Sequence, residues 1–60
     1  MPRAYLASAE QQVLSGNMSE ALRSAQAAEG GLPSGTPDWL RAQDIEMQAR
    51  AELEQGKKRR

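Results

Sequence analysis

Apolar residues recur at intervals of three and four in three segments of the chain, which predicts three amphipathic helices. The first predicted helix covers about residues 2–15. One face of it contains Tyr5, Ala9, Gln12 and Val13, and Leu6 and Leu14 widen this face. Pro2 suits a first helical position because a missing N–H costs nothing there. Gly16 follows the helix and favours the left-handed conformation that commonly ends one.

The second predicted helix covers about residues 18–29, and its apolar face is made mostly of small residues. These positions are Met18, Ala21, Leu22, Ala25 and Ala28. Asn17 can cap the N-terminus, with Glu20 three residues later as in a capping box. Gly30 and Gly31 are expected to end the helix. Because the side chains are small, this helix can approach a partner helix closely.

A loop and a third helix follow. Residues 30–37 contain three glycines and two prolines, which predicts a loop. The third helix is expected over about residues 37–55, because Thr36 is a good N-cap and Asp38 favours the positive end of the helix dipole. Its predicted buried stripe contains Trp39, Ala42, Ile45 or Glu46, Ala49 and Leu53. Gly56 is expected to end the helix.

These elements predict an all-α fold. The chain has one valine, one isoleucine and no phenylalanine, which is poor material for a sheet. We expect residues 1–56 to form a single domain, an antiparallel helical hairpin with a third, C-terminal capping helix. Trp39 is expected to be the main core wedge between the hairpin and that helix. Residues 57–60, Lys-Lys-Arg-Arg, then form a basic tail.

The first two predicted helices resemble a tetratricopeptide repeat, a helical hairpin of 34 residues with small and bulky residues at fixed positions. The matching positions within residues 2–35 are Tyr5, Ala9, Gly16, Ala21, Ala25, Ala28 and Pro33. Trp39 lies one repeat period after Tyr5, so the third helix resembles the start of a following repeat. Gln43 and Arg50 depart from the family pattern there. The chain thus resembles about one and a half repeats.

The resemblance implies a binding function. In the family, the first helix of each hairpin lines a concave groove that holds a protein or peptide. The positions placed in this groove by the resemblance are Arg3, Leu6, Glu10, Val13, Leu40, Asp44 and Met47. Apolar anchors with flanking charges suit an extended or helical peptide. The same apolar residues could instead be core or self-association surface, so the alternative is an assembly element that forms a homo-oligomer.

The chemistry of the chain argues against an enzyme. Its 60 residues include no cysteine and no histidine, which removes thiolate ligands, imidazole ligands and the commonest general base. The serines have no histidine to activate them, and the carboxylates lack the spacing of a calcium loop. We therefore predict no catalytic, cofactor-binding or metal-binding residues, and a non-catalytic interaction module.

Charge and hydropathy limit the expected partners. Eight basic and eight acidic residues cancel, but residues 1–56 hold only four of the basic ones and carry a net charge of −4. A nucleic-acid reader would show a wide basic face, so we expect no nucleic-acid partner. No apolar run approaches the length of a membrane span, and we expect no membrane association. A cytoplasmic location is the default expectation, although a fragment of a larger or exported protein would look the same.

Overall fold

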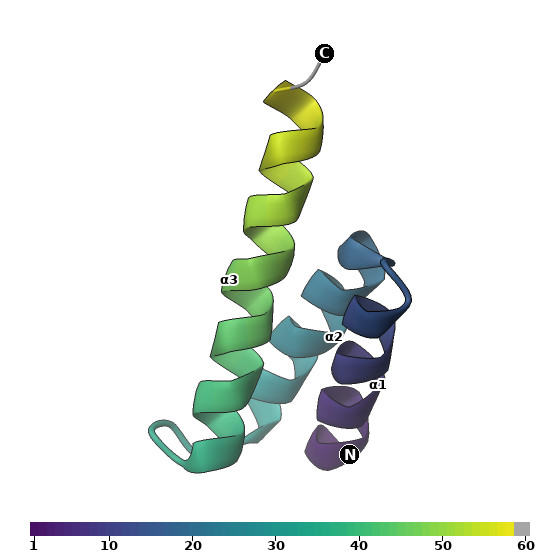
Figure 1. Ribbon diagram of the computed structural model, residues 1–60. Coiled ribbons are helices and arrows are strands. Elements are labelled where there is room, and N and C mark those ends of the chain that lie inside the picture. The colour runs from purple at the N-terminus through teal and green to yellow at the C-terminus, as the bar shows by residue number, and fades with distance from the viewer. Residues whose placement is uncertain (59–60) are drawn as a thin grey trace.

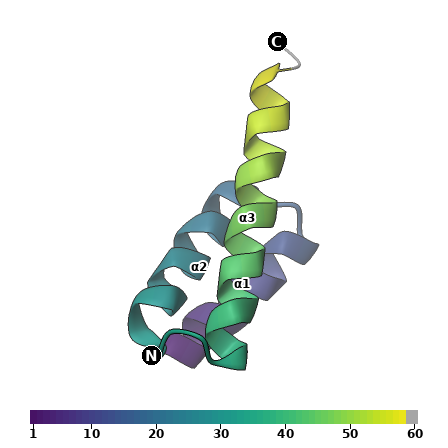
Figure 2. The same ribbon diagram turned by 90° about the vertical axis from the view of Figure 1, so that its left-hand side faces the viewer.

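The computed structural model describes residues 1–58, with side chains described through residue 56. It contains three helices, α1 (Pro2–Leu14), α2 (Met18–Gly31) and α3 (Pro37–Lys58), and no strand within the described residues. α1 and α2 form an antiparallel hairpin, and α3 packs along α2 (Figure 1). The last turns of α3 project beyond the hairpin, as Figure 2 also shows. The predicted all-α fold, with a helical hairpin and a third helix, is confirmed.

Two helices extend past the glycines that were expected to end them. α2 continues through Gly30 and Gly31 and stops where Leu32 adopts an extended backbone with φ −105° and ψ 148°. α3 continues through Gly56 to Lys58. A glycine inside a helix is unfavourable by only about 1 kcal/mol relative to alanine, which neighbouring turns can offset.

Only two glycines in the described chain adopt a positive φ, namely Gly16 at 80° and Gly35 at 84°. Gly16 lies in the tight turn between α1 and α2, and Gly35 lies in the loop before α3. Residues 57 and 58 of the predicted basic tail belong to α3, whereas residues 59 and 60 lie outside the described chain.

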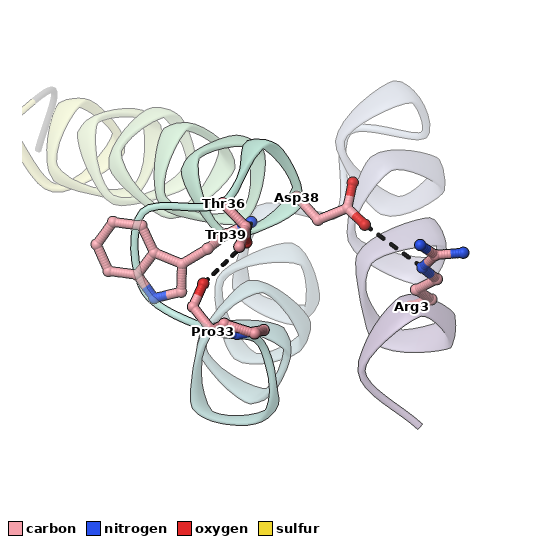
Figure 3. A network of polar contacts seen from close by, with 5 residues as sticks. All are labelled: Arg3, Pro33, Thr36, Asp38 and Trp39. Carbon is pink, nitrogen blue, oxygen red and sulfur yellow. Dashed lines mark hydrogen bonds and ion pairs between the residues drawn. The ribbon is translucent and has the colours of Figure 1, made fainter.

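The two predicted N-caps have different outcomes. The Oγ1 of Thr36 accepts a hydrogen bond from the backbone N–H of Trp39 at 3.3 Å and donates one to the carbonyl of Pro33 at 2.8 Å (Figure 3). This cap at the start of α3 is confirmed. Asn17 makes no side-chain capping hydrogen bond, so the capping box predicted with Glu20 is wrong. The Asn17 carbonyl nevertheless accepts the first bond of α2, from Ala21 N at 3.0 Å.

The core is built largely from alanine. Its buried residues are Leu6, Ala9, Ala21, Ala25, Ala28, Ala42, Ile45 and Ala49. Four larger side chains pack around this cluster and stay partly exposed: Val13, Met18, Leu22 and Leu32. The small-residue stripe predicted for α2 is confirmed. Small residues allow close helix contacts but bury little apolar area each, so the domain gains only modest hydrophobic stabilisation.

Both aromatic residues lie outside this core. Tyr5 is 47% exposed, and Leu6 beside it takes the buried position instead. Trp39 is partly exposed and does not belong to the core cluster. Its indole lies on the opposite side of α3 from Asp38 and points away from α1 (Figure 3). The prediction that Trp39 is the core wedge is therefore wrong, and Ile45 is the large buried side chain of α3.

The contact between α1 and α2 includes a close backbone approach and a polar bridge. A Cβ atom on Gly31 would lie 2.7 Å from Cγ of Pro2, so any larger residue there requires α1 to shift. With its amide nitrogen turned toward α2, Gln12 donates to Ser24 Oγ at 2.8 Å and to the Glu20 carbonyl at 2.9 Å. Neutral groups therefore make the specific contacts between the two helices of the hairpin.

Candidate binding groove between α1 and α3

A groove separates α1 from α3, because both helices pack on α2 and meet each other over a smaller contact. Two adjoining hollows that share Glu10 form this α1–α3 groove. The first hollow is lined by Arg3, Leu6, Ala7, Glu10 and Asp38. The second is lined by Glu10, Val13, Leu14, Arg41, Asp44, Ile45 and Gln48. The groove thus follows one face of each helix.

The floor of the α1–α3 groove is apolar. It contains Leu6 and Val13, seven residues apart on one face of α1, and Ile45 from α3. Leu6 and Ile45 are buried in the core, and Val13 packs against it while staying partly exposed. Leu14 stands at the edge of the groove and is 82% exposed, although its position suggested a share in the buried face. An apolar side chain from another molecule could therefore contact both Val13 and Leu14.

Two ion pairs cross the groove. Arg3 Nε lies 3.5 Å from Asp38 Oδ2, and Arg41 Nε lies 3.0 Å from Glu10 Oε2 (the first is drawn in Figure 3). All four side chains are at least 41% exposed. Exposed pairs of this kind contribute about 0.2–1 kcal/mol at most, so a charged partner could replace either member at little energetic cost.

Five of the seven residues that the resemblance placed in a groove come together here: Arg3, Leu6, Glu10, Val13 and Asp44. Leu40 and Met47 do not line it. They are 51% and 64% exposed, and helical geometry places them about 140° and about 160° around α3 from Ile45, in the same direction. The structure therefore separates an α1–α3 groove from an exposed apolar stripe of Leu40 and Met47 on the outer side of α3.

Three groove residues on α3, namely Asp38, Arg41 and Gln48, were not predicted from the sequence. Together with Ile45, these residues recur every three or four positions. Helical periodicity therefore places them at the edge of the predicted buried stripe of α3. The partners of Asp38 and Arg41 on α1 lie more than 30 residues away in sequence, so no local pattern indicates these pairings.

A second polar cluster lies across the contact between α2 and α3. The Oε2 of Glu46 accepts hydrogen bonds from Arg50 Nη2 at 2.6 Å and from Gln26 Nε2 at 3.3 Å. Glu46 and Arg50 also form an ion pair, at the i,i+4 spacing that favours such pairs on one helix. Glu29 of α2 lies close enough to Glu46 for the two carboxyl groups to shift each other's pKa, and its Oε2 is buried without a hydrogen-bond partner. We call Glu29 and Glu46 the carboxyl pair.

The members of the carboxyl pair have pKa values shifted in opposite directions. Burial, followed by the hydrogen bond to Glu46 and the charge of Glu46, raises the pKa of Glu29 from 4.5 to about 7, while Arg50 opposes the rise. The hydrogen bond from Glu29, supported by Gln26 and Arg50, holds the pKa of Glu46 below its ordinary value. The pair therefore keeps one proton, on Glu29, at mildly acidic pH.

No group of three or more acidic, histidine or cysteine residues is placed to hold a metal ion within the described residues. Over residues 1–58, no helix combines the length and the apolar character needed to cross a bilayer. Comparison of the whole sequence with protein-family models, curated proteins and solved structures found no match. The resemblance to tetratricopeptide repeats therefore stays a prediction.

Proposed function

We propose that this protein is a non-catalytic interaction module that binds a protein or peptide in the α1–α3 groove. The observation that carries the proposal is the combination of an apolar floor with exposed, weakly held charges along both walls. The resemblance to a tetratricopeptide hairpin supports the same function. The proposal requires no cofactor or metal.

The groove favours a partner segment with apolar side chains and charges of both signs. Val13 and Leu14 offer apolar surface at one end, while Arg41 and Asp44 flank it on α3. A partner carboxylate can replace Glu10 on Arg41, and a partner cation can pair with Asp44. Such exchanges fix the register of a bound peptide, whereas the apolar contacts supply most of the affinity.

A second proposal is that the chain is an assembly element that forms a homo-oligomer. It rests on Leu40 and Met47, which are large, exposed and seven residues apart on the outer side of α3. A small, alanine-rich core also gains more from association than a larger core would. In this case the stability of the fold would increase with protein concentration.

Two matched variants separate the proposals. Leu14→Asp places a charge at the edge of the groove, and Met47→Asp places the same charge on the outer side of α3, both at exposed positions. Peptides selected from a random phage-displayed library on the wild-type protein should lose binding to Leu14→Asp and keep it with Met47→Asp. Light scattering after size exclusion, over a hundredfold range of concentration, tests the alternative.

The outcomes exclude one another. A monomer at every concentration, with peptide binding that Leu14→Asp abolishes, supports the binding module. A concentration-dependent oligomer that Met47→Asp dissociates, together with a failure to select any peptide, supports the assembly element. Peptide binding that both variants weaken equally contradicts the assignment to the groove.

A further inference from the structure

The carboxyl pair lies on the flank of α3 that faces α2, away from the α1–α3 groove. Glu46 contributes an oxygen that already accepts two hydrogen bonds, from Gln26 and from Arg50. Glu29 contributes a carboxyl group close to that of Glu46 and an Oε2 atom that is buried without a partner. The Glu46 side chain is itself only 19% exposed. The pair therefore joins α2 to α3 in a partly dehydrated setting.

Two carboxyl groups can form a hydrogen bond only if one of them holds a proton, because ionised carboxylates are acceptors alone. The donors on Glu46 favour its ionised form, so the shared proton resides on Glu29. If Glu29 loses this proton, the link between the helices is replaced by two facing negative charges. The buried Oε2 of Glu29 then also carries charge without a donor, which is unfavourable.

Few other charges act on the pair. Among the described side chains, Glu46 and Arg50 are the charged groups that shift the pKa of Glu29, and both belong to α3. α2 adds Gln26, which is neutral. On α1, the charged residues Arg3 and Glu10 pair with Asp38 and Arg41 across the groove instead. Arg50 is thus the one described cation that offsets the repulsion, and its side chain is 56% exposed.

We propose that the carboxyl pair makes the docking of α3 on the α1–α2 hairpin depend on pH, firm while Glu29 is protonated and weakened once it is ionised. α3 carries one wall of the α1–α3 groove, so the same proton would also influence ligand binding there; this last consequence rests on the proposed function. The change in the docking of α3 does not depend on the proposed function.

The sign of the effect follows from linkage. The folded chain holds the Glu29 proton more tightly than the unfolded chain, since the pKa of Glu29 is about 7 in the fold and ordinarily 4.5. The resulting stabilisation is complete below the lower value and is lost as the pH rises through the higher one. The unfolding constant should rise by at most about tenfold per pH unit in this range. Partial exposure of the pair reduces the rise to several-fold overall.

The test is urea denaturation followed by circular dichroism, at constant ionic strength, between about pH 5 and about pH 8. The wild-type unfolding constant should increase several-fold with pH and then level off. Glu29→Gln supplies a permanent amide donor to Glu46, so its unfolding constant should stay near the low-pH wild-type value throughout. Glu52→Gln removes the same charge from an exposed position on α3 and should keep the wild-type pH dependence.

A direct titration covers the case in which Glu29→Gln fails to fold. The carboxyl carbon of Glu29 in the wild-type chain should titrate with a midpoint well above the ordinary pKa value of 4.5, as measured by carbon-13 NMR. A flat wild-type stability profile, an unchanged slope in Glu29→Gln, or a Glu29 midpoint near 4.5 would each overturn the proposal. None of these measurements uses a peptide ligand, so their failure leaves the proposed binding function standing, and the reverse also holds.

Discussion

The two faces of α2 make different kinds of contact. Toward α1, α2 presents Gly31, which lets the Pro2 ring come close, and a hydroxyl that meets the amide of Gln12. Toward α3, it presents Gln26 and Glu29, which meet the charged groups Glu46 and Arg50. Neutral, close contacts do not respond to pH or salt, whereas charged contacts do. The difference suggests a hairpin of fixed geometry with a third helix whose docking can be adjusted.

The largest expected effect concerns the apolar anchor of α3. Ile45 is 4% exposed, and truncation to alanine leaves a cavity in a core that otherwise consists mainly of alanine. Ile45→Ala should lower the free energy of unfolding by about 2–4 kcal/mol, measured by urea denaturation at pH 5. Met47→Ala, two residues away and 64% exposed, should change it by less than about 0.5 kcal/mol. Similar losses in both variants would contradict the assignment of the core to the Ile45 face.

The next effect tests the close approach between α1 and α2. Gly31→Ala places a Cβ atom 2.7 Å from Cγ of Pro2, so the start of α1 must shift. We expect a loss of about 1–3 kcal/mol in the free energy of unfolding, as for other overpacked contacts. Gly30→Ala is the matched control, because a Cβ atom there meets nothing within 4 Å and lies in the helix. It should stabilise the fold by about 0.5–1 kcal/mol. Equal effects of the two substitutions would show that Pro2 yields freely.

A smaller effect tests the polar bridge of the hairpin. Gln12→Ala removes the donors to Ser24 and Glu20, and should lower the free energy of unfolding by about 0.5–1.5 kcal/mol. The contact joins a side-chain amide to a hydroxyl and to a backbone carbonyl, none of which is ionisable. The loss should therefore be the same at about pH 5 and about pH 8. A pH-dependent loss would show that the hairpin contact is coupled to the carboxyl pair, which would remove the distinction between the two faces of α2.

Local features of the chain were predictable from sequence, and features that depend on the arrangement of helices were not. The alanine stripe of α2 and the Thr36 cap follow from spacing within a few residues, and both are confirmed. Tyr5 and Leu6 are adjacent and both apolar, so the buried one is decided by where α2 and α3 lie. Trp39 fitted the buried stripe by its spacing, but its indole points away from α1.

The polar sites show the same division. The ion pair of Glu46 with Arg50 lies within one helix and was predictable from its spacing. The pairing of Glu10 with Arg41 joins two helices and was not. The spacing left Ile45 and Glu46 as alternative members of the buried stripe of α3, and both make tertiary contacts in the structure. Ile45 enters the core, while Glu46 flanks it and meets Glu29. The sequence of α3 alone does not indicate that Glu46 meets the carboxyl group of Glu29, because this contact depends on the position of α2.

The smallest expected effect concerns the ion pair between Arg41 and Glu10. Arg41→Gln should change the free energy of unfolding by less than about 0.5 kcal/mol, since both side chains are exposed and the pair is screened by salt. Arg23→Gln, an exposed arginine on α2, is the control for the change in net charge. A loss well above this value that added salt does not diminish would mean that the pair holds α3 in place. With stability unchanged, any change in the affinity of a selected peptide for Arg41→Gln reports on the groove alone. A partner can then pair with Arg41 without disturbing the fold. The carboxyl pair differs in this respect, because its charge affects the docking of α3.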